Sequence, residues 1–183
     1  MEDLEFIKSV TKEEVLENWK KTEENLEHWQ NLWQAGGHTS WEDWRARTHT
    51  ALFAKNLTWN LYKVPSPLVN VPEWRGGMFN AWNKWFYPVF SEKPPKLKDF
   101  IAHPGVHNHW YVREMARSFK GTETTLIAIH SPDGNVYVVE GMHRTCAIAL
   151  MAHEKVPLNI NVYVMVAEWP ENEPPKLGHW EQK

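Results

Sequence analysis

The first part of the chain has the hydrophobic spacing of helices. Apolar residues recur every three to four positions, with one gap, at Leu16, Trp19, Leu26, Trp29 and Trp33. This spacing predicts one long amphipathic helix, which Thr11 would cap and Gly36-Gly37 would end. A second helix is expected from Trp41 to about Asn56. Residues 1–57 are therefore predicted to form an N-terminal helical hairpin, whose aromatic stripe packs on the rest of the protein or on a partner.

The rest of the chain changes between strand and helix patterns. Residues 124–130 (TTLIAIH) and 136–139 (VYVV) flank the turn sequence SPDGN, which predicts a β-hairpin. A helix from Thr145 to His153 and a strand within residues 158–167 should follow this hairpin. Before it, residues 59–64 predict a strand and residues 110–119 predict a helix. Residues 58–169 are therefore expected to form a domain of the α+β class.

Two segments fall outside this pattern. Residues 75–100 contain a glycine pair and then Met78, Phe79, Trp82, Trp85 and Phe86. They predict a short aromatic helix and a proline-rich loop. This segment would form an insertion that either covers a ligand or packs in the core. The C-terminal residues 170–183, with Pro174-Pro175 and Trp180, are expected to form an extended or disordered tail.

Composition narrows the class of protein. A length of 183 residues, with 42% hydrophobic and 23% charged residues, fits one globular domain with an appendage. The chain has no run of about 18 apolar residues and no signal-peptide pattern, so neither a membrane span nor secretion is expected. A single cysteine fits the reducing cytoplasm. A net charge of −3 does not favour a nucleic-acid partner.

The residues best suited to ligand binding or catalysis lie at the predicted strand-to-helix junction within residues 136–149 (VYVVEGMHRTCAIA). Gly141 allows a sharp turn, and the helix after it would begin with unpaired N–H groups that attract anions. His143, Arg144 and Thr145 would add an imidazole, a guanidinium group and a hydroxyl to one phosphate-sized volume. Glu140 would act as a general base, bind a metal or orient Arg144. The plain alternative is a structural turn that holds a Glu–Arg pair.

The residues Glu140-Gly141-Met142-His143-Arg144 resemble the (D/E)-G-x-(H/R)-R loop of the ParB/sulfiredoxin fold superfamily. The order strand, turn, strand, loop, helix and strand is also similar to that superfamily, over about residues 61–168. The resemblance implies a small mixed sheet with helices. It also implies that the loop, including Gly141, Met142 and Thr145, binds nucleotide phosphates. Members of the superfamily include CTP-binding partition proteins, ATP-dependent sulfinic acid reductases, free-serine kinases and putative nucleases.

The sequence departs from this superfamily at two places. Met142 stands where sulfiredoxins carry a reactive cysteine, so sulfinic acid reduction is not expected. After the predicted domain the sequence has no room for the helix-turn-helix of partition proteins. Cys146 is expected to be a buried core residue, because Ala147, Ile148 and Leu150 follow it.

Other candidate residues lie outside the loop. By resemblance to the kinase members, Glu73 is a possible counterpart of their general base, with an exposed loop carboxylate as the alternative. Arg113 and Arg117 lie one helical turn apart. The resemblance implies that their helix faces the nucleotide phosphates, and the alternative is that they form a solvated basic face. His103, His107 and His109 form a cluster that can ligate a transition metal, or simply start a helix.

Together these patterns predict a protein that binds a nucleotide, such as ATP, ADP or CTP, or another phosphorylated small molecule. If it is an enzyme, phosphoryl transfer or nucleotide hydrolysis is expected, with Arg144 stabilising charge, His143 handling a proton and Glu140 acting as base or Mg²⁺ ligand. A noncatalytic nucleotide sensor is the first alternative. A module that binds a partner or a second copy through its Trp-rich helices, and a Mg²⁺-dependent DNA nuclease, are the others.

Overall fold

The protein is organised around one five-stranded sheet. The computed structural model describes residues 3–92, 94–119 and 121–178. In spatial order the strands are β1 (Glu5–Val10), β2 (Trp59–Lys63), β6 (Asn161–Glu168), β4 (Glu123–His130) and β5 (Val136–Glu140). Only β4 and β6 run parallel to each other, and the other neighbouring pairs are antiparallel. The predicted α+β class and the β4–β5 hairpin are confirmed.

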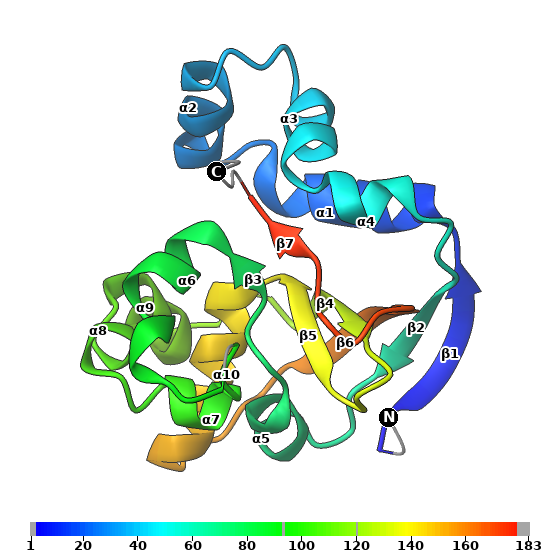
Figure 1. Ribbon diagram of the computed structural model, residues 1–183. Coiled ribbons are helices and arrows are strands. Elements are labelled where there is room, and N and C mark those ends of the chain that lie inside the picture. The colour runs from blue at the N-terminus through cyan, green and yellow to red at the C-terminus, as the bar shows by residue number, and fades with distance from the viewer. Residues whose placement is uncertain (1–2, 93, 120, 179–183) are drawn as a thin grey trace.

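The central strands are buried on both faces, which is why β4 is almost continuously apolar. Leu126 and Ala128 point into one core, whereas Ile127 and Ile129 point into the other. Helices therefore cover the sheet on both sides (Figure 1). The first core is covered by α5 (Pro67–Asn70), η1 (Val71–Glu73), α7 (Leu97–Phe100), α8 (Pro104–His107), α9 (Trp110–Arg117) and α10 (Met142–Glu154). The second is covered by α1 (Lys12–Glu23), α3 (Trp41–Thr48) and α4 (Thr50–Ala54).

The N-terminal segment differs from the predicted helical hairpin. It begins with β1, an edge strand whose only buried residue is Val10, so its sequence carries no alternation. The predicted first helix divides into α1 and α2 (Glu27–Ala35), because Leu26, directly after the gap of the hydrophobic pattern, adopts an extended conformation. The predicted second helix divides at His49 into α3 and α4. The helices α1, α3 and α4 pack on the sheet, and Trp19, Trp41 and Trp44 are buried there.

The aromatic insertion and the tail pair with each other. The predicted short helix is α6 (Asn80–Trp85), followed by η2 (Tyr87–Val89). Just before it, β3 (Met78–Phe79) pairs in parallel with β7 (Lys176–Leu177). Of the two predicted alternatives for the tail, extended or disordered, the part up to Gly178 contains the extended strand β7, and Leu177 is buried. Trp180 lies outside the described residues. Gly77 permits the close approach of this segment to β5, because a Cβ there would lie 2.1 Å from the Val138 carbonyl oxygen.

The predicted absence of a membrane span agrees with the helices of the described ranges. None of them combines the length and the apolar character that crossing a membrane requires.

Candidate functional site

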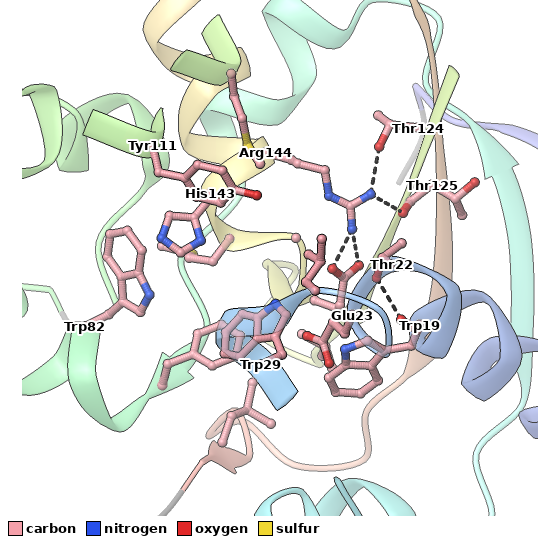
Figure 2. A pocket seen from close by; sticks show the side chains of 18 of the residues that line it. Trp19, Thr22, Glu23, Trp29, Trp82, Tyr111, Thr124, Thr125, His143 and Arg144 are labelled. Carbon is pink, nitrogen blue, oxygen red and sulfur yellow. Dashed lines mark hydrogen bonds and ion pairs between the residues drawn. The ribbon is translucent and has the colours of Figure 1, made fainter. Parts of the chain in front are cut away.

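A cavity of about 800 Å³ lies where the N-terminal helices meet the β5–α10 junction. One wall comes from α1, Leu26, α2 and α3, and the other from β4, β5, the start of α10, α6 and α9. Figure 2 shows Trp82, Tyr111 and His143 on one side of this space, Glu23 and Arg144 on the other, and Trp29 below them. The predicted loop therefore lies in the wall of this cavity.

Gly141 is required at the junction for two reasons. Its φ of +89° lies in the left-handed region, which residues with a Cβ rarely adopt. A Cβ at this position would also lie 2.7 Å from Leu126 Cδ2. Gly141 is the N-cap of α10 and provides no side-chain cap, so the helix starts at Met142 with uncapped N–H groups at the cavity wall. The predicted strand–glycine–helix geometry is confirmed.

Arg144 is held by several partners at once. Its Nη2 donates to both carboxylate oxygens of Glu140, at 2.5 Å for Oε1. Its Nη1 donates to Thr124 Oγ1 at 2.8 Å and to the Thr125 carbonyl oxygen at 3.1 Å. Of the three roles considered for Glu140, orienting Arg144 is the one that this geometry displays. Burial raises the pKa of Glu140, and the Arg144 guanidinium acts in the opposite direction.

His143 sits in an aromatic environment. Its ring centroid lies 5.2 Å from each of the rings of Trp82, His109 and Tyr111. Burial, with smaller contributions from His109 and His28, lowers the pKa of His143 to about 4. The imidazole is therefore neutral at neutral pH, so it can offer one N–H donor but no positive charge to a phosphate.

Thr145 and Cys146 are core residues. Thr145 is fully buried, donates from Oγ1 to the Met142 carbonyl oxygen at 2.9 Å and does not line the cavity. The prediction that its hydroxyl faces the ligand is therefore wrong. Cys146 is completely buried within α10, and burial raises the pKa of its thiol. The prediction of a core role for Cys146 is confirmed. Met142 is also almost buried, although it contributes to the wall.

Arg113, Arg117 and Glu73 do not join the cavity. Arg113 pairs with Glu154 at the other end of α10, with Nη1 2.5 Å from Oε1, and Arg117 is exposed. The predicted approach of both arginines to Arg144 is therefore wrong, because α9 presents its Glu114, Met115 and Ser118 side to the cavity instead. The exposed Glu73 forms ion pairs with Lys96 and Lys98 at 3.0 Å and 2.8 Å.

The histidine cluster is used for structural contacts. His103 Nδ1 accepts from the Gly105 N–H at 3.1 Å and caps α8, while His107 Nε2 lies 2.9 Å from Arg113 Nη2. His109 stacks on Trp82. Within residues 3–92, 94–119 and 121–178, no group of three or more His, Cys, Asp or Glu side chains is placed to hold a metal ion.

The sequence interpretation missed a second ion pair in the wall. Arg45 donates from Nε to Glu23 Oε2 at 2.8 Å and from Nη2 to Oε1 at 2.5 Å, and both side chains are buried. Trp41 Nε1 donates to the same carboxylate at 2.9 Å. The guanidinium of Arg45 also lies over the Trp44 ring, 3.8 Å from its centroid. In the sequence, only the presence of Glu23 and Arg45 within Trp-rich helices indicates this ion pair. Charged residues in such helices are equally typical of an exposed helix face.

The two ion pairs, Glu23–Arg45 and Glu140–Arg144, belong to opposite walls but influence each other. The Glu23 carboxylate opposes ionisation of Glu140, whereas the Arg45 guanidinium favours it. The wall of the cavity thus contains both paired charged side chains and aromatic rings.

No family model, curated protein or solved structure gives a significant match to this chain. The ParB/sulfiredoxin resemblance therefore stays a prediction that depends on the Glu140–Arg144 motif and the order of elements.

Proposed function

We propose that this protein is a nucleotide-binding protein whose ligand occupies the cavity at Gly141–Arg144. The observation that carries the proposal is that an uncapped helix start and several aromatic rings share one cavity. A helix N-terminus favours an anionic group, and aromatic faces favour a planar base. The volume of about 800 Å³ lies within the range of small-molecule sites.

The aromatic side of the cavity is suited to a nucleobase. Trp82, Tyr111 and Trp29 contribute rings to the wall, and the neutral His143 ring lies among the first two. Stacking on such rings does not distinguish one base from another, so the choice of base would depend on hydrogen bonds at its edge.

Nucleotide sensing has more support than phosphoryl transfer. Glu140 and Arg144, the proposed base and phosphate-binding group, are engaged with each other, and Glu73 lies elsewhere. A phosphotransferase or NTPase would have to separate the Glu140–Arg144 pair and recruit Mg²⁺ during its reaction. A nuclease would need DNA to reach a space enclosed by helices and lined with carboxylates.

Two further assignments belong to the same proposal. The cytoplasm is the proposed compartment, since the single cysteine fits it. A protein partner or a second copy of the chain would bind at Trp85 and Trp110, whose side chains are 68% and 71% exposed. Most of the other described tryptophans are buried.

The test is to titrate the protein with ATP, ADP, AMP, CTP and GTP, with and without Mg²⁺, and to follow thermal unfolding. A ligand at about 100 times its Kd adds about 2.7 kcal/mol to the free energy of unfolding. Tyr111→Leu should reduce this stabilisation. Trp110→Leu is the matched control, because Trp110 adjoins Tyr111 on α9 but does not line the cavity.

Phosphate release measured in parallel separates a sensor from an enzyme. Stabilisation without turnover supports sensing, and Mg²⁺-dependent turnover would support an NTPase. Absence of stabilisation by every nucleotide would reject the proposal.

A further inference from the structure

The positive charges of the cavity wall are already neutralised. Among the described residues only Arg45 and Arg144 bring cations to this wall, and each is bound to a buried glutamate, Glu23 or Glu140. Arg45 also lies over the Trp44 ring, and Arg144 also bonds Thr124 and Thr125. The charge of each guanidinium is therefore already balanced by a buried carboxylate, and a further anion at this wall would meet little net positive charge.

The wall also carries surplus negative charge. Glu114 on α9 and Glu123 on β4 line the cavity, both are exposed, and neither forms an ion pair with any described basic residue within 4.0 Å. Carboxylates therefore outnumber guanidinium groups by four to two. A phosphate monoester carries about −1.5 to −2 charges at neutral pH, and each further phosphate adds to that charge.

The neutral polar groups of the wall suit an uncharged part of the ligand. Asn18 lines the cavity from α1, and its buried Nδ2 has no hydrogen-bond acceptor. A side-chain amide without a partner can donate to a carbonyl or ring nitrogen of a base, or to a ribose hydroxyl, once its Nδ2 turns toward the cavity.

On the basis of the proposed nucleotide site, we infer that the cavity selects a nucleoside carrying at most one phosphate and discriminates against diphosphates and triphosphates. The α10 start can accept one phosphate, while the aromatic rings and Asn18 hold the nucleoside. Among the charged groups of the wall, a second or third phosphate would meet guanidinium groups that are already paired and carboxylates that have no ion-pair partner within the described ranges.

The experiment is calorimetric titration of the full chain with adenosine, AMP, ADP and ATP, with and without Mg²⁺, and with the corresponding guanine, cytosine and uracil compounds. For the preferred base, the triphosphate should bind at least about tenfold more weakly than the monophosphate or the nucleoside. Equal or tighter binding of the triphosphate, with or without Mg²⁺, would overturn the inference. If no compound binds, it is the proposed function that fails.

A charge-neutral variant tests the physical cause. The double variant Glu114→Gln and Glu123→Gln should raise triphosphate affinity several-fold more than monophosphate affinity, because both carboxylates are removed without a change of shape. Glu13→Gln is the control, since Glu13 is exposed on α1 but does not line the cavity. All three residues are exposed, so folding should be retained. An unchanged ratio of the two affinities in the double variant would also overturn the inference.

Discussion

Glu140 and Arg144 form an ion pair across the Gly141 turn, so the last residue of β5 is tied to the first turn of α10. Both side chains are largely buried, with 8% and 15% exposure. Burial makes each group dependent on the other, because a single buried charge has no water to replace its partner.

Breaking this pair should destabilise the protein strongly. We expect Arg144→Met to lower the free energy of unfolding by about 3 kcal/mol or more, because Glu140 would be left buried without its partner. The double variant Arg144→Met and Glu140→Gln should lose less free energy of unfolding than the two single variants lose in sum. Urea unfolding at neutral pH measures these differences. Arg113→Met is the control, since the more exposed Arg113–Glu154 pair should contribute only about 1 kcal/mol or less. Additive losses at positions 140 and 144 would contradict the pairing.

Gly141→Ala should be more harmful than another glycine substitution at positive φ. Gly141 and Gly134 have φ values of +89° and +80°. A Cβ at Gly134 meets nothing within 4 Å, whereas a Cβ at Gly141 would overlap Leu126. Gly134→Ala should therefore lower the free energy of unfolding by about 1 kcal/mol, through the backbone conformation alone. Gly141→Ala should lower it clearly more, because of the added contact with Leu126. Thermal and urea unfolding of both variants gives the comparison, and equal losses would show that Leu126 moves freely.

Stability should fall in mildly acidic solution because of His143. Its pKa is lowered from 6.5 to about 4 in the folded protein, so between these values the unfolded chain binds more protons than the folded one. The corresponding stabilisation is fully present above about pH 6.5 and is lost as the pH falls toward 4. A pKa shift of this size corresponds to roughly 3 kcal/mol of unfolding free energy. Unfolding free energies of the wild type and His143→Phe, measured from pH 8 to pH 4, should differ in slope within this window. Parallel curves would assign the acid dependence to other groups.

The short C-terminal strand should contribute to stability. Leu177 is 1% exposed and packs in the core on the side of the N-terminal helices. Leu177→Ala should lower the free energy of unfolding by about 2 to 4 kcal/mol, because packing contacts are lost and a cavity remains. Glu173→Ala, at an exposed position of the same segment, should change little. Chemical denaturation of both variants tests whether the tail is an integral part of the fold.

The sequence predicted the elements whose signal is local. The turn SPDGN and the glycine at 141 fix a hairpin and a strand-to-helix junction through backbone conformation alone, and both are present. It missed β1, because an exposed edge strand needs no alternation of apolar residues, and β7, whose signal is only two residues long.

A cavity lies at the predicted junction, but the residues that line it differ from the predicted set. Spacing placed Arg113 and Arg117 on one helical face, yet the direction of that face depends on how α9 packs, with Val112 turned into the core. Similarly, Glu23 and Arg45 meet through the packing of α1 against α3, a tertiary contact that no local pattern encodes. Pairing of buried charges is decided by three-dimensional proximity, so sequence spacing cannot assign it.

The wall of the cavity is shared between helices that enter near the N-terminus and a junction that lies far along the chain. Neither part lines the space alone, so the cavity forms only when the N-terminal helices have docked on the β5–α10 junction. A ligand held there would bind the fully assembled state and not partly folded ones. The abundance of such a protein in a cell would therefore follow the supply of its ligand, because the unoccupied form opens more readily to proteases.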